Sequence, residues 1–102
     1  MKFEWEDDKR EKTIRERGID FIDAAKVWND PQRQERVDRR ENYGEVRVQT
    51  IGRVHFGILF VVYTERSYED GEEVIHIISA RKADKRERRE YETMTFCARY
   101  IG

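Results

Sequence analysis

The sequence predicts an α+β domain in which N-terminal helices precede an antiparallel sheet of about four strands and a C-terminal helix closes the chain. Two apolar runs of strand length, residues 56–63 and 74–80, lie in the second half of the sequence. Helix signals flank them, because an apolar stripe of helical period comes before the first run and a capping-box spacing follows the second. With 102 residues, the chain has the usual length of one domain with a single core.

The N-terminal segment is expected to form an extended stretch and a surface helix. Phe3 and Trp5 alternate with polar neighbours, which indicates a short strand or an extended arm. The acidic residues 6–8 favour the first turn of a helix, because the helix dipole stabilises anions there. Gly18 is typical of the position just past a helix end, and Ile14 is the one clearly inward residue.

A second helix is predicted from Asp20, a good N-cap residue, with Asp23 completing a capping box. Its apolar residues have the i, i+3, i+4, i+7 spacing of one buried stripe, and they are Phe21, Ala24, Ala25 and Trp28. We interpret Trp28 as a core residue and not as a platform for stacking nucleic-acid bases. Asn29-Asp30-Pro31 is expected to end this helix.

The middle of the chain is predicted to start the sheet. Residues 32–45 are polar and fit either a short edge strand at 35–38 or a mobile loop. Residues 46–51 alternate like a half-buried strand, which Gly52 is expected to close. The apolar run 56–63 is predicted to be the central strand, with both faces covered and a neighbour on each side.

Turn and cap signals predict the rest of the sheet and the last helix. Asp70-Gly71 marks a turn, after which residues 74–81 are expected to return antiparallel to the central strand. Asp84-Lys85-Arg86-Glu87 has capping-box spacing and opens the final helix. Three residues of this helix are expected to face the sheet, namely Tyr91, Met94 and Ala98.

Composition limits the classes of function. Charged residues make up 42% of the chain but the net charge is -1, so overall charge does not favour nucleic-acid binding. The two histidines and the single cysteine, Cys97, lack the spacing of a zinc site, and no glycine-rich phosphate loop is present. We therefore expect no metal and no cofactor. With neither a signal peptide nor a membrane-length apolar run, the chain is expected to be cytoplasmic.

Basic residues gather at the predicted strand ends. Antiparallel pairing predicts one patch that contains Arg53, His55, Arg81 and Lys82, with Arg66 elsewhere. Guanidinium groups bind phosphate bidentately, and lysine supplies a mobile positive charge. An exposed strand-end arginine contributes little to stability, so Arg81→Ala is expected to remove function without unfolding the protein. The alternative interpretation is that Arg66 and Arg81 form structural ion pairs with nearby carboxylates.

The final helix carries a local excess of positive charge. Residues 81–89 contain six Lys or Arg and two acidic residues, a net charge of +4. Lys85, Arg86 and Arg89 are predicted to bind phosphates. For this run taken alone, a solvated helix face with intrahelical ion pairs is the alternative.

These cations permit RNA cleavage without a metal. The 2′-hydroxyl of RNA can attack the adjacent phosphate, given a base, cations for the oxyanion and an acid for the leaving oxygen. Glu65 or a histidine near the patch is a candidate for proton transfer. His76, inside a strand, is interpreted as a tolerated strand residue and not as a catalytic group.

Six short motifs, in order along the chain, resemble one protein family. They are Phe3-Glu4-Trp5-Glu6 with Lys9; Arg17-Gly18-Ile19-Asp20-Phe21 with Ala24-Ala25; Thr50-Ile51-Gly52-Arg53; Val61-Val62-Tyr63-Thr64-Glu65-Arg66; Ile77-Ile78-Ser79-Ala80-Arg81-Lys82-Ala83; and Glu87-Arg88 with Tyr91-Glu92. Together they resemble the BrnT toxin family of bacterial type II toxin–antitoxin systems. The resemblance extends from Phe3 to about Glu92.

The resemblance implies a RelE-like fold, a single toxin domain over residues 1–102, and an endoribonuclease that halts translation. Because no metal-ligand pattern is present, this cleavage is expected to be metal-independent. The implied partner is a BrnA-like antitoxin with a ribbon-helix-helix part, which neutralises the toxin and represses the operon with it. The motifs carry over five catalytic candidates, Lys9, Arg53, Arg66, Arg81 and Lys82. The RNA-binding candidates beside them are His55, Lys85, Arg86 and Arg89.

The sequence departs from the family pattern at two positions. Arg17 stands where the family has a histidine before a glycine, and His76 stands where a basic strand residue is common. If the family histidine transfers protons, this member is impaired or uses another group. Two alternatives to a ribonuclease toxin therefore stay open. One is an inactive homologue that serves only as an antitoxin-binding co-repressor, and the other is an RNA- or protein-binding module of the same fold.

Overall fold

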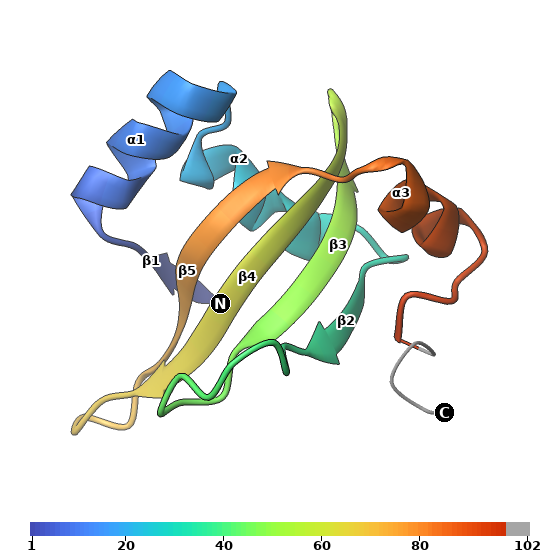
Figure 1. The fold of residues 1–102 in the computed structure, drawn as a ribbon. Helices are drawn as coiled ribbons and strands as arrows, with labels where there is room; N and C mark the ends of the chain where they lie inside the picture. Colours follow the sequence, from blue (N-terminus) through green and yellow to red (C-terminus); the bar gives the residue numbers. More distant parts are fainter. Residues whose placement is uncertain (98–102) are drawn as a thin grey trace.

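A mixed five-stranded sheet organises residues 1–97, the part of the chain that this computed structural model describes (Figure 1). Its strands have the order β1-β5-β4-β3-β2. In chain order the elements are β1 (Lys2–Glu4), α1 (Asp7–Arg17), α2 (Phe21–Ala25), the 3₁₀ helix η1 (Lys26–Asn29), β2 (Gln34–Val37), β3 (Val48–Val54), β4 (Gly57–Ser67), β5 (Glu73–Lys82) and α3 (Lys85–Glu92). The α+β class predicted from the sequence is confirmed.

The sheet differs from the prediction in strand number and in type. Strands β2 to β5 form an antiparallel meander, as predicted. However, β1 pairs with β5 in parallel, with Lys2 opposite Val74 and Glu4 opposite His76. The prediction of an antiparallel sheet of about four strands is therefore wrong, because a three-residue strand carries no local signal of its distant partner.

The central and edge strands lie where the sequence predicts them. β4 lies between β3 and β5, and β2 occupies the edge, so the edge-strand interpretation of residues 35–38 is confirmed. Gly52, however, lies within β3 instead of closing it. A Cβ atom at Gly52 would lie 2.8 Å from Val27 Cβ, so glycine here permits the close approach of η1 to the sheet.

Helix α1 ends at Gly18, as predicted, in the left-handed conformation with φ of 68°. The buried residue of α1 is Thr13, whereas Ile14 is 41% exposed, so the prediction of an inward Ile14 is wrong. The physical reason is the position of the helix: α1 contacts β5 (Figure 1), and the face that it presents there carries Lys9 and Thr13.

Helix α2 begins at Asp20, whose carboxylate accepts a hydrogen bond from the Ile22 amide at 3.0 Å. This confirms the N-cap. The predicted capping box is wrong, since the Asp23 carboxylate instead pairs with Lys26 at 3.1 Å. A five-residue helix followed at once by a 3₁₀ turn brings these two side chains together.

Two apolar clusters fill opposite faces of the sheet. The first, on the face covered by α2 and η1, consists of Ile19, Phe21, Ala24, Val27, Val54, Leu59, Val61, Tyr63, Ile75, Ile77 and Ala80. The second, on the face beside α3, consists of Ile51, Ile58, Phe60, Val62, Ala83, Tyr91 and Phe96. Trp28 is half-buried against the first cluster, with its ring edge-on to Phe3 and Tyr63. Its interpretation as a core residue is confirmed.

The capping box that opens α3 is confirmed, with reciprocal hydrogen bonds between Asp84 and Glu87. Tyr91 is buried, as expected. Met94 is 54% exposed and lies past the helix with φ of 57°, so its predicted orientation toward the sheet is wrong. The helix ends at Glu92, too early to carry Met94 on its inner face. Ala98 lies outside the described residues.

A β-bulge in β5 decides which of its side chains share a face. In the β4–β5 register, Ser79 is opposite Val62 and Ile77 is opposite Tyr63, so Ile78 is the extra residue. Side chains alternate across a strand, and an extra residue reverses the alternation. His76 therefore falls on the same face as Arg81, the face beside α3, although five positions separate them.

Candidate functional site

The basic residues at strand ends form two groups at opposite ends of β4. In the register, Arg53 is opposite Ile58 and Arg81 is opposite Phe60, whereas Arg66 is opposite Val74. At the rise of an extended strand, the distance along β4 from Phe60 to Arg66 is about 20 Å. The predicted separation of Arg66 from the other strand-end arginines is confirmed.

The predicted patch at the first end is divided between the two faces of the sheet. Arg81 shares its face with Phe60, whereas Lys82 is opposite Leu59, which belongs to the cluster under α2 and η1. Alternation along β5 is the reason. Arg53 lies on the same face as Arg81, because its partner Ile58 belongs to the cluster beside α3.

Arg81 is held by a buried carboxylate. Its two terminal nitrogens donate to the two Glu87 oxygens at 2.7 and 2.9 Å. The guanidinium also lies over the Phe60 ring, 4.1 Å from its centroid. The Glu87 side chain is 8% exposed, so this bidentate pair anchors the start of α3 to the sheet.

Arg53 belongs to a network that joins η1, β3 and α3. Its backbone amide and the Tyr91 hydroxyl both donate to Oδ2 of Asp30 at 2.6 Å. Its guanidinium lies 5.5 Å from the centroid of the Tyr91 ring. Burial acts to raise the pKa of Asp30, but the hydrogen bonds from Tyr91, Arg53 and Gln32 outweigh it and lower this pKa.

The predicted RNA-binding residues are exposed. His55 lies in the turn between β3 and β4, with its ring edge-on to Phe56 at 4.8 Å. Lys85, Arg86 and Arg89 project from α3, and within residues 1–97 their side chains form no ion pair. These three cations are therefore available to an anionic partner.

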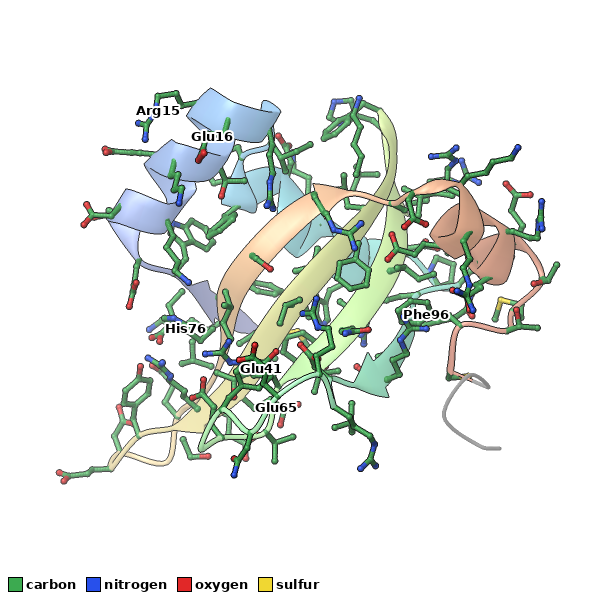
Figure 2. All side chains as sticks on the ribbon, in the orientation of Figure 1. Arg15, Glu16, Glu41, Glu65, His76 and Phe96 are labelled. Carbon is green, nitrogen blue, oxygen red and sulfur yellow. The ribbon has the colours of Figure 1, made fainter. Side chains whose placement is uncertain are left out.

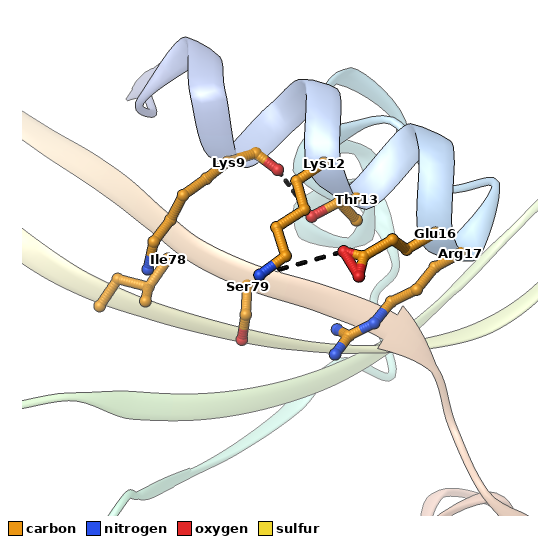
Figure 3. A pocket seen from close by; sticks show the side chains of 7 residues that line it. All are labelled: Lys9, Lys12, Thr13, Glu16, Arg17, Ile78 and Ser79. Carbon is orange, nitrogen blue, oxygen red and sulfur yellow. Dashed lines mark hydrogen bonds and ion pairs between the residues drawn. The ribbon is translucent and has the colours of Figure 1, made fainter.

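A cleft of about 280 Å³ lies between α1 and the end of β5. Lys9, Thr13 and Arg17 follow one another at intervals of four along α1, so they lie on one helix face (Figure 3). Arg17 donates to the carbonyl of Ala80 at 3.1 Å. The remaining lining residues are Lys12, Glu16, Ile78 and Ser79.

The cleft has an excess of positive charge. Lys12 approaches Glu16 at 4.0 Å, the limit of an ion pair, and Figure 3 shows this contact. No hydrogen bond or ion pair of the Lys9 ammonium occurs in the described part of the chain. With Arg17, the cleft thus has three cations and one carboxylate, and the cationic side chains reach toward β5.

A smaller cleft of about 70 Å³ shares Lys9 and Ile78 with the first and extends toward Arg66. Glu6, Glu45, Arg47, Arg66 and His76 complete its lining. Lys9 therefore connects a basic cleft to a second site that contains a histidine.

His76 forms a short hydrogen bond with a carboxylate. Its Nδ1 atom lies 2.6 Å from Oε2 of Glu4, its direct neighbour in the parallel β1–β5 register. Figure 2 marks the position of His76 on the sheet. Tyr68 donates to the other Glu4 oxygen at 2.6 Å, and Arg66 approaches Oε2 at 3.5 Å. The Tyr68 hydrogen bond lowers the pKa of Glu4 most, burial opposes it, and the interaction with His76 lowers it further.

The sequence analysis did not predict the hydrogen bonds of His76 and Tyr68 with Glu4. Glu4 is 72 positions from His76 and 64 from Tyr68, and no local pattern connects them. The interval of four between Lys9, Thr13 and Arg17 was a usable signal, since it places all three on one helix face.

Two further classes of site are absent from the described residues. Between residues 1 and 97, no three His, Cys, Asp or Glu side chains are grouped to hold a metal ion. In the same range, no helix has the length and apolar character needed to span a membrane.

Comparison with known proteins assigns the chain to a family. A family model described as "Ribonuclease toxin, BrnT, of type II toxin-antitoxin system" matches residues 5–87. The chain belongs to the BrnT family. A search of curated proteins finds no match. The BrnT match includes α1, the whole meander and the start of α3, and therefore both clefts.

Membership of the BrnT family indicates a ribonuclease toxin of a type II toxin–antitoxin system. An enzyme of this kind acts on RNA and has a protein antitoxin as its partner. The resemblance seen in the sequence motifs is thereby confirmed at the level of the family.

Proposed function

We propose that this BrnT protein is a metal-independent endoribonuclease that cleaves RNA with the basic cleft between α1 and β5 as its phosphate-binding site. The observation that carries this proposal is the excess of cations in the cleft, where Lys9 is unpaired within residues 1–97 and lies beside Lys12 and Arg17. Ammonium and guanidinium groups bind RNA phosphates and stabilise the oxyanion of the transition state. Arg66 continues this positive surface through the smaller cleft.

The predicted site residues fall into three groups with different roles in this proposal. Lys9 and Arg66 line the clefts and contact the phosphate. Lys85, Arg86 and Arg89 on α3 contact the RNA farther along its backbone. Arg81 and Arg53 hold α3 and η1 against the sheet through Glu87 and Asp30.

The direct test uses the purified full chain with a fluorescent RNA oligonucleotide in EDTA. Cleavage is expected to persist in the chelator and to yield 2′,3′-cyclic phosphate and 5′-hydroxyl ends, identified by mass spectrometry. The same oligonucleotide with 2′-deoxyribose at the cleaved position is expected to stay intact. Activity that requires added Mg²⁺ contradicts the metal-independent mechanism, and cleavage of the deoxy control contradicts attack by the 2′-hydroxyl.

A charge-reversal pair locates the phosphate site. Lys9→Glu is expected to weaken RNA binding at least tenfold and to reduce its dependence on salt, because one phosphate contact is lost. Lys26→Glu makes the same charge change at η1, where Lys26 pairs with Asp23 at 3.1 Å. Equal losses of RNA binding in the two variants would show that net charge, and not the cleft, controls binding.

The fold and the partner follow from the same proposal. The N-terminal helices, the antiparallel β2–β5 meander and the closing helix support a RelE-like ribonuclease fold.

A BrnA-like ribbon-helix-helix antitoxin neutralises the toxin by covering the α3 cations, and the two together repress their operon. Arg86→Glu combined with Arg89→Glu should slow antitoxin association, and this association should weaken as salt rises. The alternative apolar face near Trp5, Phe21 and Trp28 is unsuitable, because Phe21 is fully buried and the tryptophans pack against the core.

One observation favours a second function. The Arg81 guanidinium is paired with Glu87 and the Arg53 guanidinium lies 5.5 Å from the Tyr91 ring centroid, so two of the predicted catalytic cations have partners within the fold. A catalytically inactive homologue that binds the antitoxin and acts only as co-repressor is consistent with this. Induced expression without the antitoxin separates the two functions, since growth arrest supports the ribonuclease and normal growth supports the co-repressor.

A further inference from the structure

We infer that His76 is the catalytic base of RNA cleavage, with Glu4 as the residue that positions it. This inference rests on the proposed ribonuclease function and adds the proton-transfer site, which lies at the Arg66 end of the sheet and not at the Arg81 end. Its basis is the hydrogen-bonded group of Glu4, Tyr68 and His76, of which His76 lines the smaller cleft.

The parallel pairing of β1 with β5 fixes Glu4 against His76. The two residues are directly opposite in the register, and the carboxylate lies 2.6 Å from Nδ1. Tyr68 donates to the second carboxylate oxygen at 2.6 Å, so Glu4 cannot rotate away without breaking two short contacts. An ionised Glu4 can only accept, so Nδ1 carries the proton in this hydrogen bond. Neutral His76 therefore has its lone pair on Nε2, as a general base requires.

The location of His76 suits this role. Its side chain is 10% exposed and lines the smaller cleft, which Lys9 connects to the phosphate-binding cleft. The bulge at Ile78 places His76 on the face beside α3, the face that also carries Arg66. A phosphate held between Lys9 and Arg66 would thus have a histidine beside it.

The charges around His76 come from every neighbouring element. Glu4 faces it from β1, Glu6 and Lys9 from the start of α1, Arg66 from β4, and Glu45 and Arg47 from the segment before β3. Arg47 pairs with Glu45 at 3.2 Å and Arg66 approaches Glu4 at 3.5 Å. Arg66 is 43% exposed and approaches Glu4 through one nitrogen, and Lys9 has no ion pair within residues 1–97, so these two cations are available to a substrate phosphate.

The reaction transfers one proton through His76. Nε2 takes the proton of the 2′-hydroxyl while O2′ forms a bond to phosphorus and the bond between phosphorus and O5′ breaks. O5′ leaves with a proton from solvent water, and the imidazolium returns its proton to the hydroxide that results. The products are a 2′,3′-cyclic phosphate and a 5′-hydroxyl end, and no water is consumed. Lys9 and Arg66 stabilise the negative charge on the phosphoryl oxygens.

The pH dependence of cleavage tests this assignment with the full chain and a cleavable RNA oligonucleotide. In the wild-type protein, kcat should fall toward acid pH, because a protonated imidazole cannot accept the 2′-hydroxyl proton. His76→Gln should lower kcat by a factor of about 10² or more and remove this acid limb. Its affinity for the uncleavable 2′-deoxy oligonucleotide should stay close to wild type, because His76 acts on the hydroxyl and not on the backbone charge.

Two control variants separate a catalytic role from a structural one. His55→Gln removes the other histidine, which has an aromatic neighbour and no carboxylate partner among the described residues, and it should retain the acid limb. Glu4→Gln should lower kcat less than His76→Gln does and should also retain the limb, because His76 is still present but less firmly oriented. If His76→Gln fails to fold, as judged by circular dichroism, His76→Ala with added imidazole replaces it, and rescue of cleavage by imidazole supports the assignment.

The outcomes distinguish this inference from the proposed function. If wild type cleaves RNA and a folded His76→Gln variant cleaves at the same rate with the same acid limb, His76 is not the base and the ribonuclease proposal stands. His76 is likewise excluded as the base if imidazole fails to rescue a His76→Ala variant that binds the deoxy oligonucleotide normally. If wild type binds RNA but cleaves none at any pH, the ribonuclease proposal and this inference both fail.

Discussion

Replacing Arg81 with alanine should destabilise the protein, because it leaves a buried carboxylate without its main partner. Arg81 donates to both oxygens of Glu87 at 2.7 and 2.9 Å, and 8% of the Glu87 side chain is exposed. Among the contacts described for residues 1–97, Glu87 then keeps the hydrogen bond from the Asp84 amide at 2.9 Å. A single backbone donor does not compensate a buried charge.

The contacts set the size of the effect. Removing one partner of a fully buried ion pair costs about 3–5 kcal/mol. The Arg81 side chain is 36% exposed, so solvent screens the pair and we expect about 2 kcal/mol from its loss. The guanidinium over the Phe60 ring contributes about 0.5 kcal/mol more. For a domain of this size, the sum corresponds to a decrease in melting temperature of roughly 10–20 °C.

Thermal and urea unfolding, followed by circular dichroism, measure this effect. Glu87→Gln should lower the free energy of unfolding less than Arg81→Ala does, because the charge that loses its partner is then a partly exposed arginine and not a buried carboxylate. The double variant should be more stable than Arg81→Ala alone, since an amide at position 87 is neutral. Arg86→Ala, at the exposed position directly before Glu87 in α3, is the control and should change stability by less than about 0.5 kcal/mol.

A melting temperature of Arg81→Ala within about 2 °C of wild type would refute this reasoning. It would favour the sequence-based expectation that Arg81→Ala removes function while the protein stays folded. Loss of growth arrest in Arg81→Ala therefore has meaning only beside the unfolding measurement.

Two further substitutions test the packing and the electrostatics. Gly52→Ala would place a Cβ atom 2.8 Å from Val27 Cβ and 3.1 Å from its carbonyl oxygen, so urea unfolding should show a loss of about 1–3 kcal/mol. Hydrogen bonds from Arg40 lower the pKa of Asp38 below its ordinary value of 3.8, while burial opposes them. Asp38 therefore stabilises the protein above about pH 4, and this contribution is lost as pH falls through the lowered pKa. Asp38→Asn should lower the free energy of unfolding by about 1 kcal/mol at pH 7 and by progressively less below about pH 4. A loss of stability that does not change with pH would contradict the ion pair with Arg40.

Much of the fold was predictable because its signals are local. Gly18 ends α1, Asp20 caps α2, and the Asp84–Glu87 box opens α3, each through contacts within a few residues. The apolar run of β4 and the Asp70-Gly71 turn together indicate the antiparallel meander. The family motifs are likewise short and ordered along the chain, so they can be recognised from the amino-acid sequence.

The candidate site was only partly predictable. The motifs identify Lys9 and Arg66, which line the two connected clefts. The predicted patch, however, is divided, because side chains alternate along β5 and Lys82 therefore lies on the opposite face of the sheet from Arg81. The spacing around Glu87 predicts a capping residue, whereas its pairing with Arg81 depends on the path of the chain between β5 and α3.

The sequence by itself determined the helices, the meander and the family, because neighbours within a few residues fix caps, turns and periodicity. Tertiary structure alone decided that β1 joins β5, which brings Glu4 to His76 across 72 positions. It also decided the bulge at Ile78, and one extra residue moves His76 to the face of Arg66. Strand pairing and register depend on the packing of the whole sheet. The residues next to a three-residue strand or a single histidine in the sequence do not indicate which distant residues will lie beside it in the fold.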